Sequence, residues 1–78
     1  MSIVSEHVME LVQLTQISEN TYRPLPKQNL SERELNLFWR YHGRFPNDFA
    51  LGLNGLLDNE RLIEYDHLTN TLITETVS

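Results

Sequence analysis

The chain has 78 residues and a mass of 9.2 kDa, which is enough for a single domain over residues 1–78. Hydrophobic residues make up 40% and charged residues 22% of the sequence, so collagen-like, low-complexity and strongly disordered classes are excluded. Because there is no cysteine, disulfides, thiolate metal sites and thiol catalysis are excluded as well. A chain this short buries only about 60–65% of its unfolded surface, so a partner or second copy would add usefully to its stability.

The charged residues are unevenly distributed along the sequence. The formal net charge is −5, from 11 acidic and 6 basic residues. Five of the basic residues lie within 21–46, whereas 1–20 and 47–78 are acidic. A basic middle between acidic ends either neutralises itself within the fold or forms a polarised surface that selects an oppositely charged partner.

The first predicted element is a helix over residues 5–17. No glycine or proline interrupts this segment, and Ser5 stands where an N-cap is expected. Its apolar side chains recur near the helical period, at Val8, Leu11, Val12 and Ile17.

A linker is predicted over residues 19–29. Pro24 and Pro26 are separated by one residue, and each restricts its own backbone and that of the residue before it to extended conformations. We therefore expect this proline-containing segment to join the first two helices and to lie across the body of the domain.

The strongest local pattern predicts a second helix that begins after Ser31. Ser31 and Glu34 have the spacing of a capping box, in which the serine hydroxyl and the glutamate carboxylate each accept a hydrogen bond from the other residue's backbone N–H. We expect this helix to run to Tyr41 or His42 and to stop at Gly43, because glycine favours the left-handed conformation that ends many helices.

A third helix is predicted after Pro46. Apolar side chains follow one helical face over residues 49–57. Gly52 and Gly55 each disfavour a helix interior by about 1 kcal/mol relative to alanine, which leaves open whether the segment forms one helix or two.

The C-terminal segment has the composition of strands. Residues 62–66 and 71–77 are rich in β-branched and aromatic side chains, and the turn-like residues 67–70 separate them, so a β-hairpin is predicted. The predicted fold class is therefore α+β: a small three-helix domain with a C-terminal β-hairpin. Its element order resembles that of a winged-helix domain.

Residues 39–45 concentrate side chains that are typical of protein interfaces. This segment contains the only tryptophan, two arginines, a tyrosine and a phenylalanine. Apolar side chains of the second helix cover an arc of about 200°, whereas a helix that meets a single core needs only about 100°. The candidate partner-binding residues are Leu37, Trp39, Arg40, Tyr41, Arg44 and Phe45. The alternative is that this helix is central to the fold, with Trp39 as its main core residue.

No motif for catalysis, a cofactor or a metal is present. His7, His42 and His67 are too far apart in the sequence to have the spacing of zinc ligands. The segment 52–55 is too short for a phosphate-binding loop and lacks its lysine, and no nucleophile elbow is found. We therefore expect neither an enzyme nor a cofactor.

These patterns predict a small non-catalytic protein-binding module, an inhibitor or adaptor that occludes a surface of a larger macromolecule or associates with itself. The alternative is a winged-helix transcriptional regulator that binds DNA through its basic middle segment. Binding to nucleic acid is disfavoured because residues 47–60 and 66–71, which include the expected recognition helix and wing, contain no lysine or arginine.

The sequence also predicts a cytoplasmic protein without a membrane partner. No apolar run approaches the roughly 18 residues of a membrane-spanning helix. Glu6 and Glu10 lie where a signal peptide would have basic residues followed by an uninterrupted apolar stretch.

Overall fold

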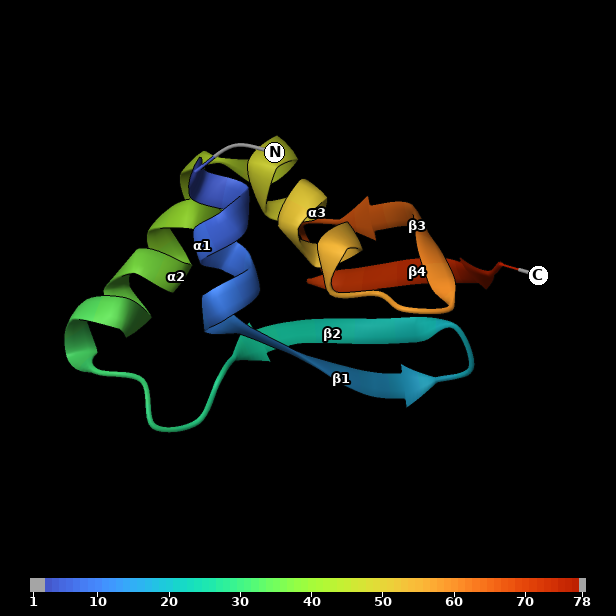
Figure 1. Cartoon of the computed structure of the whole chain (residues 1–78), viewed down its shortest axis with the longest axis horizontal. Coiled ribbons are helices and arrows are strands. Elements are labelled where there is room, and N and C mark those ends of the chain that lie inside the picture. The colour runs from blue at the N-terminus through green and yellow to red at the C-terminus, as the bar shows by residue number, and fades with distance from the viewer. Residues whose placement is uncertain (1–2, 78) are drawn as a thin grey trace.

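The computed structural model describes residues 3–77 and consists of three helices and a four-stranded antiparallel sheet (Figure 1). The strands lie in the order β1-β2-β4-β3. The α+β class is as predicted, but two strands separate the first two helices. The elements are α1 (Ile3–Leu11), β1 (Val12–Ser18), β2 (Thr21–Pro26), α2 (Glu32–Arg44), α3 (Pro46–Gly55), β3 (Glu60–Asp66) and β4 (Thr71–Thr76).

The first helix is shorter than the prediction over 5–17. It ends at Leu11, and Ser5 is buried inside it rather than capping it. The residues that follow form β1 because their side chains alternate between the two faces of a sheet: Val12 is buried, whereas Gln13 and Thr15 are exposed. The spacing of apolar residues in this segment fits both the helical and the strand period, and pairing with the next strand selects the strand.

The segment 19–29, predicted as a linker, contains strand β2. Its two prolines can be accommodated because the backbone N–H and C=O groups of successive residues in a strand point to opposite neighbouring strands. The Lys27 N–H donates to the Leu11 carbonyl over 2.9 Å, so the odd-numbered residues of β2 face β1. Pro24 and Pro26 therefore lie on the side facing β4, and the β2–β4 ladder has only two register pairs.

The hydrophobic core lies mainly among the three helices, which gather at one end of the sheet (Figure 1), and Val12 of β1 and Leu72 of β4 join it from the strands. Helices α1 and α3 approach each other closely at Gly52, where an added Cβ would lie 2.7 Å from the Val8 side chain and 2.8 Å from the Ser5 carbonyl oxygen. Pro46–Gly55 is thus one continuous helix that needs a glycine at this crossing. The most deeply buried core side chains are Val8, Phe38, Phe49, Leu53 and Leu72.

Helix α2 begins as predicted and ends later than predicted. The Glu34 N–H donates to Ser31 Oγ over 3.2 Å, and the Ser31 N–H donates to Glu34 Oε1 over 3.1 Å, which completes the capping box. These bonds hold the pKa of Glu34 below its ordinary value. Gly43 does not stop the helix, which continues to Arg44; no glycine among residues 3–77 has a positive φ.

The predicted C-terminal hairpin is present as β3 and β4. A bulge between Leu62 and Glu64 interrupts its register. Asp66 accepts backbone hydrogen bonds from Leu68 and Thr69 in the turn, and these bonds lower its pKa. Across the described range, 3–77, no helix is long and apolar enough to cross a membrane.

Candidate functional site

Helix α2 exposes a broad surface on the side that faces away from the core. The helix buries Phe38 and Tyr41 and leaves most of its other side chains in solvent. We define the α2 face by five exposed residues of this helix. Two of them are large and apolar: Leu35 is 38% exposed and Trp39 is 49% exposed. The five residues are Arg33, Leu35, Trp39, Arg40 and Arg44.

Trp39 is anchored on one side and open on the other. Its ring packs edge-on against Phe38, with 4.8 Å between ring centroids, and against His42, with 5.6 Å. Phe38 is fully buried. The alternative in which Trp39 is the main core residue of the helix is therefore wrong, since its neighbour Phe38 has that place. A rigid, half-exposed tryptophan has apolar area available for a contact outside the chain.

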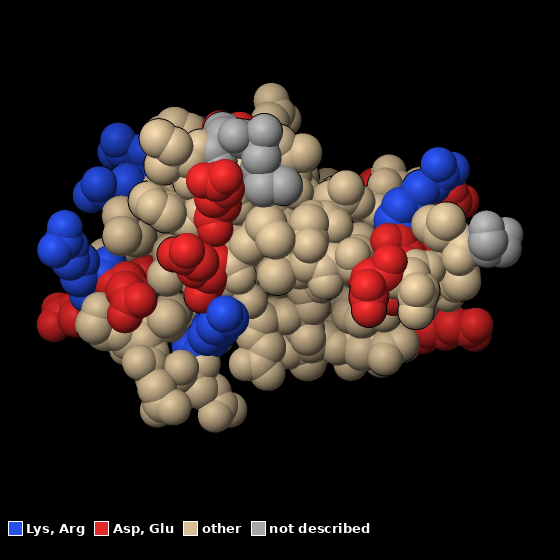
Figure 2. All heavy atoms as spheres, viewed as in Figure 1, with Lys and Arg blue, Asp and Glu red and all other residues tan. Residues whose placement is uncertain are grey.

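The arginines of the α2 face form no ion pair within the part of the chain that the structure describes. None of Arg33, Arg40 and Arg44 forms an ion pair with another residue of the range 3–77; the ion pair found there joins Arg61 to Glu75 on the sheet. Figure 2 shows blue side chains gathered at the end of the molecule that α2 forms, with red side chains beside them. Arginines that form no ion pair within the described residues favour an acidic partner surface.

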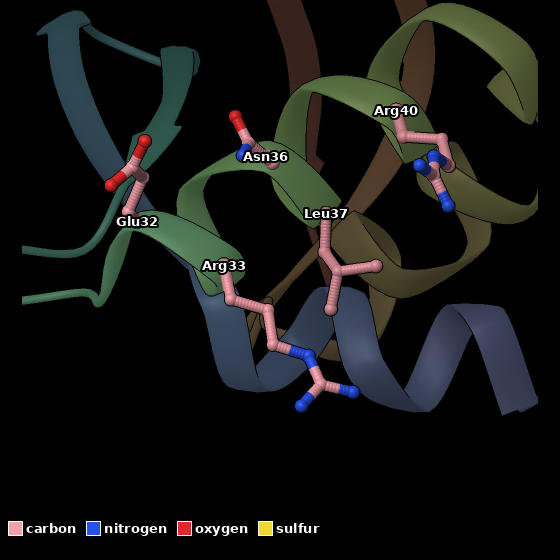
Figure 3. Close-up of a pocket in the computed structure, with 5 residues that line it drawn as sticks. All are labelled: Glu32, Arg33, Asn36, Leu37 and Arg40. Atoms are coloured by element: carbon pink, nitrogen blue, oxygen red, sulfur yellow. The ribbon is translucent and has the colours of Figure 1, made fainter.

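An open hollow of about 610 Å³ lies along the same helix (Figure 3). Figure 3 shows Arg33 and Leu37 projecting on the same side of α2, with Arg40 one turn further along. Leu37 is partly buried and supplies an apolar floor between the two guanidinium groups. The lining residues are Glu32, Arg33, Asn36, Leu37 and Arg40.

The structure divides the predicted partner-binding residues into two groups. Trp39, Arg40, Arg44 and Phe45 are exposed, and Leu37 is partly buried at the margin of the α2 face. The sixth residue, Tyr41, lies in the core, where its hydroxyl is 3.0 Å from His7 Nδ1.

Two residues of the α2 face were missed by the sequence analysis. Arg33 precedes the aromatic segment by two helical turns and lies on the same flank of the exposed surface as Arg40, whereas Leu35 lies one turn before Trp39 on the other flank. The spacing along the helix was the signal that could have found them.

Gly43 lies on the helix surface between Trp39 and Arg40. Apart from its chain neighbours and the backbone of its own helix, no heavy atom lies within 4 Å of the position that a Cβ would take there. Glycine inside a helix is less stable than alanine by roughly 0.5–1 kcal/mol. The packing of the described chain does not require this glycine, and its absent side chain leaves a flat point at which another backbone could approach closely.

A second cluster joins the end of α2 to the β3–β4 turn. The His42 and His67 rings stack with 4.6 Å between centroids, although the two residues are far apart in the sequence. His42 Nε2 is 3.2 Å from Asn70 Oδ1, and His67 Nε2 is 2.8 Å from the His42 carbonyl. Burial raises the pKa of Tyr65 to about 12. Both ring nitrogens that face inward are hydrogen-bonded, so this cluster is structural.

The His42 environment predicts a loss of stability in mild acid. Burial, followed by repulsion from His67, lowers the pKa of His42, against the opposing effect of its hydrogen bond to Asn70 Oδ1. The unfolded chain therefore binds this proton more readily than the folded one. The stabilising contribution is present above the ordinary value of 6.5 and is lost as the pH falls through it toward the lowered value. Urea unfolding between about pH 5 and 8 measures this slope.

The matched control for this experiment is His42→Asn, which lacks the titrating group. We expect the variant to lose part of the dependence on pH above 5, whereas an unchanged slope would contradict the assignment to His42. The carboxyl groups with lowered pKa, such as that of Glu60, start from an ordinary pKa of 4.5, so their effect on stability falls mainly below this window.

A third cluster surrounds the Glu60 carboxylate at the far end of the sheet. It accepts hydrogen bonds from the Tyr22 hydroxyl, from Thr74 Oγ1 over 2.7 Å and from Asn20 Nδ2 over 3.1 Å. The bonds from Tyr22 and Thr74 lower the pKa of Glu60. An ionised and saturated carboxylate of this kind holds the two hairpins together and is a poor proton acceptor.

Comparisons with known proteins add no family to these observations: no family model matches the chain, and neither curated proteins nor solved structures include a significant match. Within residues 3–77, no group of three or more potential ligands among His, Cys, Asp and Glu could hold a metal ion. The α2 face is consequently the surface with the most distinctive chemistry.

Proposed function

We propose that this protein is a non-catalytic binding module that uses the α2 face to dock onto an acidic surface of another protein in the cytoplasm. In this role it acts as an inhibitor or adaptor by covering that surface. The partner contacts Trp39 and Phe45 through apolar side chains and pairs its carboxylates with Arg33, Arg40 and Arg44.

The observation that carries the proposal is the exposure of Trp39 beside unpaired arginines. Trp39 is 49% exposed while the adjacent Phe38 is fully buried, so the chain has room for only one of the two in its core. Tryptophan and arginine are the residue types that contribute most often to hot spots in interfaces, because each buries a large surface and retains a polar group. Trp39 and Arg40 are adjacent and both exposed on α2, and this association favours recognition over core packing.

Co-purification from the native cells tests the proposal. The tagged protein is compared with a double variant, Trp39→Ser with Arg40→Glu, and with a matched control, Ile63→Ser, which changes an exposed apolar residue on the sheet. We expect an acidic protein that is recovered with the parent and the control but not with the double variant. Equal recovery with all three chains would contradict the proposal.

Gly43→Ala is expected to separate folding from binding. The added methyl group enters open space, so the free energy of unfolding should rise by about 0.5–1 kcal/mol. The same methyl group stands between Trp39 and Arg40, where a partner must approach, so recovery of the partner should fall. Thermal unfolding and co-purification measure the two effects. A less stable variant would contradict the open space at Gly43, and full partner recovery would show that Gly43 has no part in docking.

The alternative function is a winged-helix regulator that binds DNA. The order α2, α3, β3, β4 is compatible with a helix pair followed by a wing, and the free arginines of α2 could contact phosphates. Against it, α3 contains Asp48 and no lysine or arginine, and the turn at 67–70 contains none either.

Binding to random duplex DNA distinguishes the two functions. Tight binding that weakens steeply with salt would favour the regulator, because released counterions would then supply the affinity. We expect no binding at about 50 mM salt, which would favour docking to a protein.

A further inference from the structure

The two edges of the sheet differ in chemistry. Edge strand β3 carries Glu60, Arg61, Glu64 and Asp66 and is interrupted by a bulge. Edge strand β1 has seven residues, none of them charged and none a proline, and its bulge lies beyond Gln16. Folded proteins protect exposed edges with charges, prolines and bulges, because unpaired backbone groups there can pair with another chain. The β1 edge lacks most of this protection.

The hydrogen bonding of β1 shows which of its backbone groups face outward. The Lys27 N–H donates to the Leu11 carbonyl. By the strand register, Gln13 and Thr15 also direct their backbone N–H and C=O groups toward β2. Alternate residues of an antiparallel strand point their backbone groups to opposite sides. The N–H and C=O groups of Leu14 and Gln16 are therefore directed away from β2, toward the open edge.

We propose that β1 pairs antiparallel with β1 of a second copy of this chain, around a two-fold axis at Thr15. In this register, Leu14 of each copy exchanges both backbone hydrogen bonds with Gln16 of the other copy. The two four-stranded sheets join into one continuous sheet. This surface is separate from the α2 face, so the dimer presents two copies of that face.

A second copy fits this edge because the strand is complementary to itself. A two-fold axis at Thr15 places threonine opposite threonine, a favourable cross-strand pair, and the strand itself carries no charged residue that would repel its copy. The same register places Glu19 of one copy opposite Leu11 of the other. Lys27 is bonded to Leu11, so Glu19 and Lys27 of opposite copies lie at the same end of the new interface.

Amide hydrogen exchange, followed residue by residue at low and high protein concentration, tests this arrangement. An interface of a few strand residues is small, so we expect a dimer that forms at up to about 1 mM protein. The Leu14 and Gln16 amides should exchange more slowly as the concentration rises. The Thr15 amide, already bonded within the chain, should not change. A chain that stays monomeric, or a dimer in which Leu14 and Gln16 exchange unchanged, would overturn the proposal.

Sedimentation of charge variants provides a second readout. Thr15→Lys places two lysines at the axis and should raise the dimer Kd about fivefold, whereas the control Ile63→Lys on the β3 edge should not. Glu19→Lys or Lys27→Glu alone should weaken the dimer, and the double swap should restore it. Equal effects of Thr15→Lys and Ile63→Lys, or a swap that fails to restore dimerisation, would contradict the register.

Discussion

Phe38→Ala is expected to unfold much of the protein at physiological temperature, while Trp39→Ala leaves it folded. Phe38 is fully buried and packs edge-on against Phe49 with 5.6 Å between ring centroids, so its removal leaves a cavity in the centre of the core. Such truncations cost about 3–5 kcal/mol. A chain of this length has a net stability of only about 4–12 kcal/mol.

The adjacent Trp39→Ala substitution removes a larger side chain but a smaller buried area. Because about half of the Trp39 surface is already in solvent, we expect a loss below about 2 kcal/mol. Urea denaturation of the two variants gives the comparison directly. If Trp39→Ala were as destabilising as Phe38→Ala, the tryptophan would be a core residue and the α2 face would lose its main apolar contact.

Gly52→Ala is the second substitution for which a large effect is expected. Alanine is more stable than glycine in a helix interior by about 1 kcal/mol, but we expect a steric clash at position 52 to outweigh this gain. The new Cβ would lie 2.7 Å from the Val8 side chain and 2.8 Å from the Ser5 carbonyl oxygen, so α1 and α3 must move apart. Overpacking of this kind costs up to about 3 kcal/mol and would lower the Tm by roughly 4–8 °C for each kcal/mol.

The matched control is the same substitution at Gly43, which enters open space. Thermal unfolding of both variants should therefore give shifts of opposite sign. If Gly52→Ala raised the Tm as Gly43→Ala is expected to do, the close crossing of α1 and α3 would be incorrect.

Sequence reasoning was most successful where local chemistry determines the structure. The capping box at Ser31 and Glu34 fixes the start of α2 because both hydrogen bonds form within one helical turn. The C-terminal hairpin was also predicted correctly, since β-branched runs and a polar turn specify it locally.

The N-terminal hairpin could not be predicted in the same way. The segment from Val12 to Ser18 has apolar spacing that fits a helix and a strand, and only pairing with β2 selects the strand. Pro24 and Pro26 indicated a linker, but β2 accommodates both because their side of the strand is paired with β4 at only two positions. Such tertiary compensation leaves no signal in the local sequence.

The burial of the candidate site residues could not be predicted from the sequence for a similar reason. A wide apolar arc on α2 predicts that two sides are covered, but Phe38 and Trp39 are neighbours of similar character. Which of them enters the core depends on Phe49 and the helix crossing rather than on the periodicity of α2. The exposed tryptophan and the uncompensated arginines are visible only once the fold is known.

Site-specific photocrosslinking from the α2 face tests the central claim most directly. A photoreactive side chain is introduced at Asn36, which is exposed beside Arg40 and lines the hollow, and separately at Ile63 on the sheet. In native cells we predict one acidic protein crosslinked from position 36 and absent from position 63. Illumination that yields no adduct at position 36, or the same products at both positions, would contradict docking through helix α2.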